Sequence, residues 1–189
     1  MTTSLSADIL ARLRAETRPY HEALEQNSFN QALSAGVPTQ ELTNWFLRKM
    51  YGFLVPYEQQ LRQHSWPPAW QVERRYRAHL ILQDLSAEAS SAALPLCVTM
   101  PPLHTLPELL GAMYVLEGST LGGQVIARQL AKAGITTRTY FSGYADQTGP
   151  MWKSFCQLLN EAATEINQDE IVLSARRTFQ HLDAWLNHE

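Results

Sequence analysis

The 189-residue sequence has little cysteine, no excess of basic charge and no long uninterrupted run of apolar residues. Its two cysteines, Cys97 and Cys156, form no CxxC pair and are too few for a disulfide framework, which favours a reducing compartment. Fifteen Lys plus Arg against eighteen Asp plus Glu give a formal net charge of −3, so we expect no nucleic-acid partner.

Neither a membrane span nor an export signal is expected. The residues before Asp8 show no basic start followed by an apolar run, and arginines follow soon afterwards. The uncharged stretch 89–107 is long enough to raise the question of a membrane span, but it contains four prolines and several hydroxyl residues. We interpret it as a loop and predict a cytoplasmic protein.

Apolar residues recur at steps of three and four, which is the spacing of one helix face, and no convincing alternating strand pattern appears. The predicted fold is therefore all-α, one domain over residues 1–189 with about six to eight helices. We expect a kink or restart at Pro19, and a solvated face in the charged segment 73–77. The expected helices cover about 6–26, 39–62, 70–85 and 106–133, with two more that begin near 150 and 167.

Three glycines interrupt the fourth expected helix, at Gly118, Gly122 and Gly123. Each costs about 1 kcal/mol relative to alanine in a helix interior, so something should offset the cost. Gly118 and Gly122 share one face, which presents bare backbone to its neighbour. That neighbour could be another helix packed closely against the glycines, or a flat ligand.

The six histidines form no HxxxH or HExxH pair, so a zinc hydrolase is not expected. His21 differs from the others because it lies near the apolar register of the first helix, with Glu25 one turn later. It could be a core histidine or a single axial ligand to haem iron, oriented by Glu25. Arg14 and Arg18 share that helix, either as a solvated face or as partners for anionic groups of a ligand.

Two segments together resemble the haem oxygenase family. The first reads LRAETRPYH over 13–21, and the second reads YVLEGSTLGGQ over 114–124. The resemblance spans most of the chain, and is strongest to the bacterial, biliverdin-producing branch, whose members often accompany bacteriophytochromes. It implies an all-α haem oxygenase-like sandwich that holds haem between a proximal helix and a glycine-kinked distal helix.

By this resemblance, His21 ligates the iron and Glu25 is the family's acidic residue one turn later. Gly118 and Gly122 would lie over the distal face of the haem, where the missing side chains leave space for dioxygen. Gly123 would support the same kink.

The resemblance also assigns the remaining candidates. Arg14 and Arg18 match basic positions that approach the haem propionates, and Lys153 is a further candidate for them. Ser119 stands where mammalian-type enzymes carry an aspartate that organises distal water, and serine cannot hold a charge. Gln157 lies near a position where those enzymes use an arginine against a propionate.

The implied activity is oxidative cleavage of haem b, both cofactor and substrate, to biliverdin, carbon monoxide and ferrous iron. The reaction would take O2 and electrons from a donor such as a ferredoxin or a reductase, and a bacteriophytochrome could receive the biliverdin. Two alternatives stay open: a haem carrier or sensor that releases haem intact, and a protein of this fold that binds another small ligand.

Overall fold

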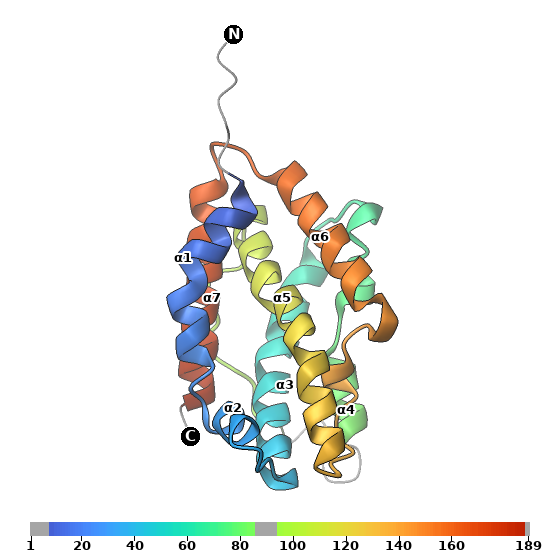
Figure 1. The fold of residues 1–189 in the computed structure, drawn as a ribbon. Helices are drawn as coiled ribbons and strands as arrows, with labels where there is room; N and C mark the ends of the chain where they lie inside the picture. Colours follow the sequence, from blue (N-terminus) through green and yellow to red (C-terminus); the bar gives the residue numbers. More distant parts are fainter. Residues whose placement is uncertain (1–7, 86–93, 188–189) are drawn as a thin grey trace.

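The computed structural model describes residues 8–85 and 94–187, and within these ranges the chain is helical and forms no strand, which confirms the all-α prediction (Figure 1). None of the helices in these ranges is long and apolar enough to cross a membrane. The α-helices are α1 (Ile9–Leu24), α2 (Ser28–Ser34), α3 (Gln40–Gln63), α4 (Ala78–Leu85), α5 (Leu106–Lys132), α6 (Thr148–Ala162) and α7 (Gln168–Asn187). Short 3-10 turns are η1 (Pro68–Trp70), η2 (Val72–Arg75), η4 (Tyr140–Ser142) and η5 (Ala145–Gln147).

The two most extensive helix–helix contacts of the fold both involve α7. Both α1 and α5 pack along it, and α3 also contacts it (Figure 1). Helix α6 contacts both α5 and α1, while α4 packs on α3 and on η4. Helices α1 and α5 therefore both rest on the same helix, α7.

Capping side chains fix the starts of the long helices. Thr105 accepts from the Glu108 amide, and the Glu108 carboxylate accepts from the Thr105 amide at 3.0 Å, a complete capping box. Thr39 caps α3 in the predicted place. Helix α1 runs without interruption through Pro19, so of the two possibilities predicted there, a kink or a restart, the restart is wrong.

Two local predictions are corrected. The segment expected as one helix over 70–85 forms η2 and then the shorter α4, and the seven-residue α2 had not been predicted. Glu73 and Arg74 of this segment are exposed, as the predicted solvated face requires, but Arg75 and Arg77 are each only 3% exposed and carry buried charge instead. The N-terminal residues before Asp8 and the first part of the 89–107 stretch lie outside the described residues.

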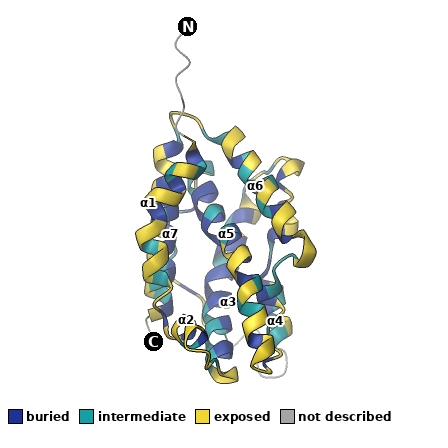
Figure 2. Cartoon of the chain, in the orientation of Figure 1, coloured by how far each residue is buried: buried dark blue, intermediate teal, exposed yellow. Residues whose placement is uncertain are grey.

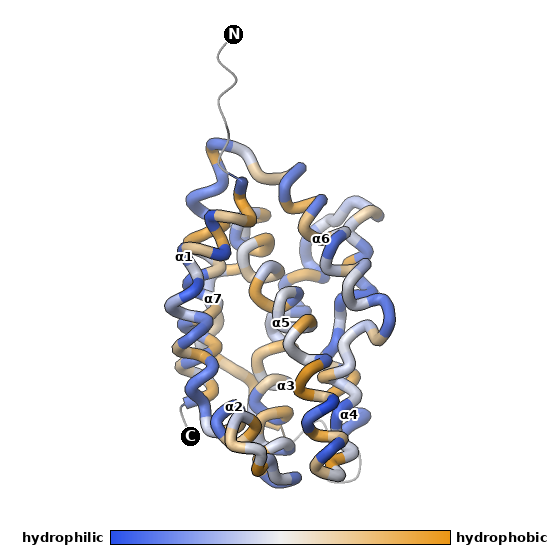
Figure 3. Tube along the Cα trace, viewed as in Figure 1, coloured by the Kyte–Doolittle hydropathy of each residue, from blue (hydrophilic) through white to orange (hydrophobic). Residues whose placement is uncertain are grey.

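Helix α1 changes its character along its length. Its fully buried residues are Ile9, Leu13 and Thr17, all in its first ten positions. The stretch after Thr17, residues 18–24, which carries His21, has only half-buried and exposed residues, and it is largely hydrophilic in Figure 3 and yellow or teal in Figure 2. This stretch therefore borders an opening instead of the core.

A close helix contact lies at Gly111, where α5 meets α7. A Cβ at this position would lie 2.4 Å from the Ile171 carbonyl oxygen and 2.6 Å from the Ser174 Cβ. We expect Gly111→Ala to destabilise the fold by about 1–3 kcal/mol despite alanine's better helix propensity, because the two backbones must separate. Chemical denaturation measures the loss; an unchanged midpoint would contradict the contact. Gly149→Ala is the control, since nothing lies within 4 Å of its Cβ.

Candidate functional site

A cleft runs between α1 and α5 with α7 as its floor. It consists of two adjoining cavities of about 490 Å³ and about 560 Å³, each within the usual size of small-molecule sites. Its apolar walls include Met50 from α3 and Leu182 from α7. The two cavities share the lining residues His21, Leu24, Glu25, Met50, Gly118, Ser119 and Leu182. His21 and the glycine face of α5, which lie 97 positions apart in sequence, thus meet in one space.

The His21 side chain is available to a ligand, because it is 57% exposed. Its Nδ1 lies 3.6 Å from the Glu25 carboxylate one turn later, which leaves Nε2 to face outward. The edge of the ring packs against Phe179 on α7 with centroids 5.7 Å apart. A carboxylate at one nitrogen and an aromatic support are the surroundings that orient a metal-ligating imidazole.

The three glycines of α5 have different surroundings. Nothing lies within 4 Å of a Cβ built at Gly122, and at Gly118 the nearest atoms belong to the Trp152 ring at 3.6 Å. At Gly123 a Cβ would lie 2.6 Å from the Phe141 carbonyl oxygen. Close packing thus explains Gly123, while Gly122 leaves bare backbone beside the cleft. Helix α5 continues through all three glycines.

Ser119 lines both cavities, but its hydroxyl donates to the Leu116 carbonyl at 2.7 Å within its own helix. The hydroxyl proton is therefore used in a hydrogen bond to the backbone, and Oγ can still accept a hydrogen bond from a donor in the cleft. Position 119 therefore carries no charge in this chain, whereas the resemblance places an aspartate at this position in mammalian-type enzymes.

Basic residues border the cleft at the end of the smaller cavity. Arg14 and Arg18 both line it and are exposed. Lys153 is exposed on α6 and is not one of the lining residues, although its neighbour Trp152 is. Gln157 is also outside the lining, and it donates to Glu161 at 2.9 Å.

A buried polar layer lies behind α5 and was missed by sequence reasoning. Glu117 is ion-paired with Arg75 and accepts from the Tyr144 hydroxyl at 2.7 Å. Arg77 lines the larger cavity and donates from Nη2 to the Leu116 carbonyl at 2.6 Å. Its Nε has no hydrogen-bond partner in the described residues. Nothing in the local sequence distinguishes these charges from exposed ones.

Burial and neighbouring charges raise the pKa of two members of this layer, Tyr144 and Arg77. Burial, with the Glu117 carboxylate beside it, raises the pKa of Tyr144 above its usual range, so the phenol stays a donor. Burial alone would lower the pKa of Arg77, but Tyr140, Tyr144 and Glu117 raise it overall, so the guanidinium stays charged. The layer therefore holds α5 from behind with fixed charges.

The fold and the cleft define a class: a helical protein with a largely apolar cleft between two helices, with one histidine on one side and bare helix backbone on the other. A family model described as "Heme oxygenase" matches residues 7–188. A haem oxygenase from Xanthomonas campestris is 29% identical over 169 residues, which cover 84% of this chain and 97% of that one.

Solved structures of haem oxygenases have the same fold. The protein from Synechocystis, solved in complex with haem, has a TM-score of 0.78 at 16% identity and covers 96% of this chain and 91% of its own. The Neisseria meningitidis protein, solved with NO and CO bound, has a TM-score of 0.77 at 21% identity with the same coverage. The Leptospira interrogans protein has a TM-score of 0.75 at 16% identity and covers 95% and 98%.

The chain belongs to the haem oxygenase family. It is therefore an enzyme, and its expected function is the degradation of haem.

Proposed function

We propose that this chain binds haem b in the cleft between α1 and α5 and cleaves it to biliverdin, carbon monoxide and ferrous iron. The observation that carries the proposal is the meeting of His21 and the bare backbone at Gly122 across one largely apolar cleft. Bound haem supplies the iron at which dioxygen reacts, and it is also the substrate. The protein contributes binding, orientation and a restricted space.

His21 is the proposed iron ligand. Ligation uses Nε2 of the neutral imidazole, and Glu25 near Nδ1 holds the tautomer that leaves Nε2 unprotonated. Phe179 supports the ring from the side and limits its rotation. This arrangement sets the plane of the haem relative to α5.

The proposed distal wall is the face of α5 that carries Gly118 and Gly122. The absence of side chains lets the helix backbone approach the haem closely and leaves room for dioxygen. Ser119 is placed to accept a hydrogen bond from water there, since its own proton is used within the helix. Gly123 acts indirectly, by allowing the Phe141 segment to pack against α5.

Arg14 and Arg18 are the proposed partners of the haem propionates, because both line the cleft at its exposed end. Each can pair with a carboxylate through two parallel hydrogen bonds. Lys153 stays a weaker candidate, since it lies outside the cleft lining.

Cleavage of haem by O2 consumes electrons that these side chains do not supply, so we propose a ferredoxin-like donor or a reductase as partner. We also propose a cytoplasmic location and the bacteriophytochrome-associated bacterial branch, with biliverdin passed to the photoreceptor. Both cysteines are free thiols, and burial raises the pKa of Cys156 to about 11, which suits a reducing compartment.

The second candidate function is a haem carrier or sensor that releases haem intact. The observation that favours it is Ser119, whose hydroxyl carries no charge and donates to its own helix. A general acid at this position would need a proton to give.

An absorption time course distinguishes the two functions. One equivalent of haemin is added to the protein in air, followed by ascorbate or a ferredoxin reducing system. A Soret band that decays under reductant, with biliverdin in the extract, supports cleavage. A Soret band that persists under reductant and air supports the carrier, and no Soret band at all contradicts both.

Gly122→Phe tests the distal wall. We expect stability to rise by up to about 1 kcal/mol, because a glycine leaves a helix interior and its Cβ meets nothing within 4 Å. We expect haem turnover to fall by about 100-fold, because the ring displaces the haem from its productive position. Thermal melting and biliverdin release measure the two effects. Gly149→Phe, away from the cleft, is the matched control, and wild-type turnover in Gly122→Phe would contradict the assignment.

A further inference from the structure

A single row of aromatic rings leads from the cleft to a groove on another part of the surface. Trp152 lines the cleft beside Gly118, and its ring stacks on Phe155 one turn later on α6, with centroids 5.7 Å apart. Phe155 contacts Trp70 of η1 at 6.2 Å, and Trp70 contacts Trp66 at 5.4 Å. Trp66 lines an open groove of about 770 Å³.

The composition of this row is unlike that of the other aromatic cluster. Phe29, Phe46 and Phe141 stack on one another near the opposite end of the cleft, and phenylalanine rings are hard to oxidise. The one tyrosine in contact with them, Tyr140 at 5.4 Å from Phe141, is only 5% exposed. The row instead holds three of the five tryptophans of the chain, and indole is among the side chains most easily oxidised by one electron. Trp70, in the middle, is only 6% exposed, so it is shielded from direct attack.

We propose that the row Trp152–Phe155–Trp70–Trp66 carries oxidising equivalents out of the cleft to the surface groove. This inference rests on the proposed binding of haem. The oxidant is hydrogen peroxide that reacts with the bound haem outside productive turnover. Reduction of one peroxide to two waters takes two electrons and two protons, so the row is used twice. Each time the oxidised haem takes one electron from Trp152, the electron deficiency passes across Phe155 to Trp70, and Trp66 is the last ring of the row to be oxidised.

The electrons and protons of the reaction are balanced at the groove. Trp66, left one electron short, loses its indole proton to water there. A small anionic reductant such as ascorbate then returns one electron, and the proton follows. The groove suits such an anion, because Arg74 and Arg62 line it against the acid Glu73, with Arg62 also 3.5 Å from the Glu58 carboxylate. The net result is that ascorbate, and not the protein, is oxidised by the peroxide.

Local charge does not block the row. The Arg75 guanidinium lies 5.7 Å from the Phe155 ring centre, and an unpaired cation there would make it harder to remove an electron from the ring. Arg75 is paired with Glu117, so the field at Phe155 is largely cancelled. The ion pair behind α5 thus leaves the path close to neutral.

The experiment maps oxidation on the haem-loaded protein. Peroxide is added without reductant, an electron paramagnetic resonance spectrum is recorded after rapid freezing, and oxygen addition at each tryptophan is quantified by peptide mass spectrometry. We expect the spectrum of an indolyl radical, and oxygen addition at Trp66 well above that at Trp45 and Trp185. Oxygen addition at a tryptophan is called its mark below. The Soret band, recorded first, shows separately whether haem is bound; its absence would remove the proposed function and this inference together.

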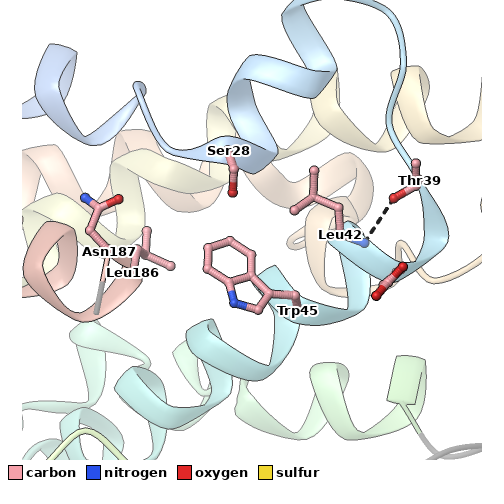
Figure 4. Close-up of a pocket in the computed structure, with 7 residues that line it drawn as sticks. Ser28, Thr39, Leu42, Trp45, Leu186 and Asn187 are labelled. Carbon is pink, nitrogen blue, oxygen red and sulfur yellow. Dashed lines mark hydrogen bonds between the residues drawn. The ribbon is translucent and has the colours of Figure 1, made fainter. Parts of the chain in front are cut away.

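Trp45 is the internal control for diffusing oxidant. It lies in a separate open groove, where its ring faces Ser28 and Leu42 with Leu186 at the far side (Figure 4). Peroxide or radicals that escape into solution reach this ring freely. Equal marking of Trp45 and Trp66 would therefore overturn the proposal.

Two variants complete the test. Trp70→Phe keeps a ring in the row but removes its easily oxidised member, so marks at Trp66 should fall to the level seen without haem. Trp45→Phe should leave the Trp66 marks unchanged. If Trp70→Phe does not fold, Trp66→Phe is used, and the marks should then move inward to Trp70. Marks at Trp66 that survive Trp70→Phe, or an unmarked Trp70 in Trp66→Phe, would overturn the proposal.

Discussion

In His21→Ala, we expect turnover of haem to fall by at least about 100-fold. Changing a residue that only orients a metal ligand commonly costs 10–100-fold in activity, and loss of the ligand itself should exceed that range. The ring is 57% exposed and contacts Phe179 and Glu25 at its edges, so its removal should leave the fold intact. The measurement is biliverdin yield under reductant, with the Soret maximum as the record of iron ligation.

Added imidazole sharpens this test. Because the cleft is open at His21, free imidazole should enter the space left by the missing ring and restore part of the Soret shift and of the turnover. His79→Ala removes an exposed histidine of α4 that lies outside the cleft, and should behave as wild type. Unchanged turnover in His21→Ala would end the assignment of His21 as ligand.

In Glu117→Ala, we expect the free energy of unfolding to fall by about 3–5 kcal/mol. The substitution leaves the Arg75 guanidinium buried without its counter-charge, and it also removes the acceptor of the Tyr144 hydroxyl. For a chain of this size, the loss corresponds to a fall in Tm of roughly 10 °C. Thermal and chemical denaturation give the value.

Two further variants separate burial from charge. Glu16→Ala breaks the exposed pair with Arg12, where the distance is 3.1 Å, and should cost no more than about 1 kcal/mol. The double variant Arg75→Met, Glu117→Leu removes both buried charges and should recover much of the loss. A Glu117→Ala effect as small as that of Glu16→Ala would show that the buried pair contributes little.

Sequence reasoning located the long helices because their signals are local. The Thr105 capping box, the Thr39 cap and the apolar periodicity of α3 and α5 each lie within a few residues of the feature they predict. Helix α2 was missed because seven residues are too few to show a period. The segment around Arg75 was misjudged because consecutive charges resemble a solvated face until their partners are known.

For the site, the sequence placed His21 and Gly122 as a pair only through a resemblance to a known family. Spacing alone left each with an ordinary packing explanation, and for Gly123 packing against Phe141 is what the structure contains. Arg75 and Glu117 are 42 positions apart, and pairing over such a separation has no local pattern. Burial of charge is decided by tertiary contacts, so it could not be predicted from one sequence.

The common floor under α1 and α5 has a mechanical consequence for product release. Both helices pack on α7, and the buried residues of α1 are Ile9, Leu13 and Thr17, with none from 18 to 24. Helix α1 is therefore held by buried packing up to Thr17, and its His21 end is the end of the cleft that can separate from α5. Under the proposed function, the opened tetrapyrrole would leave through that end, and the packing of α1 and α5 on α7 would stay intact.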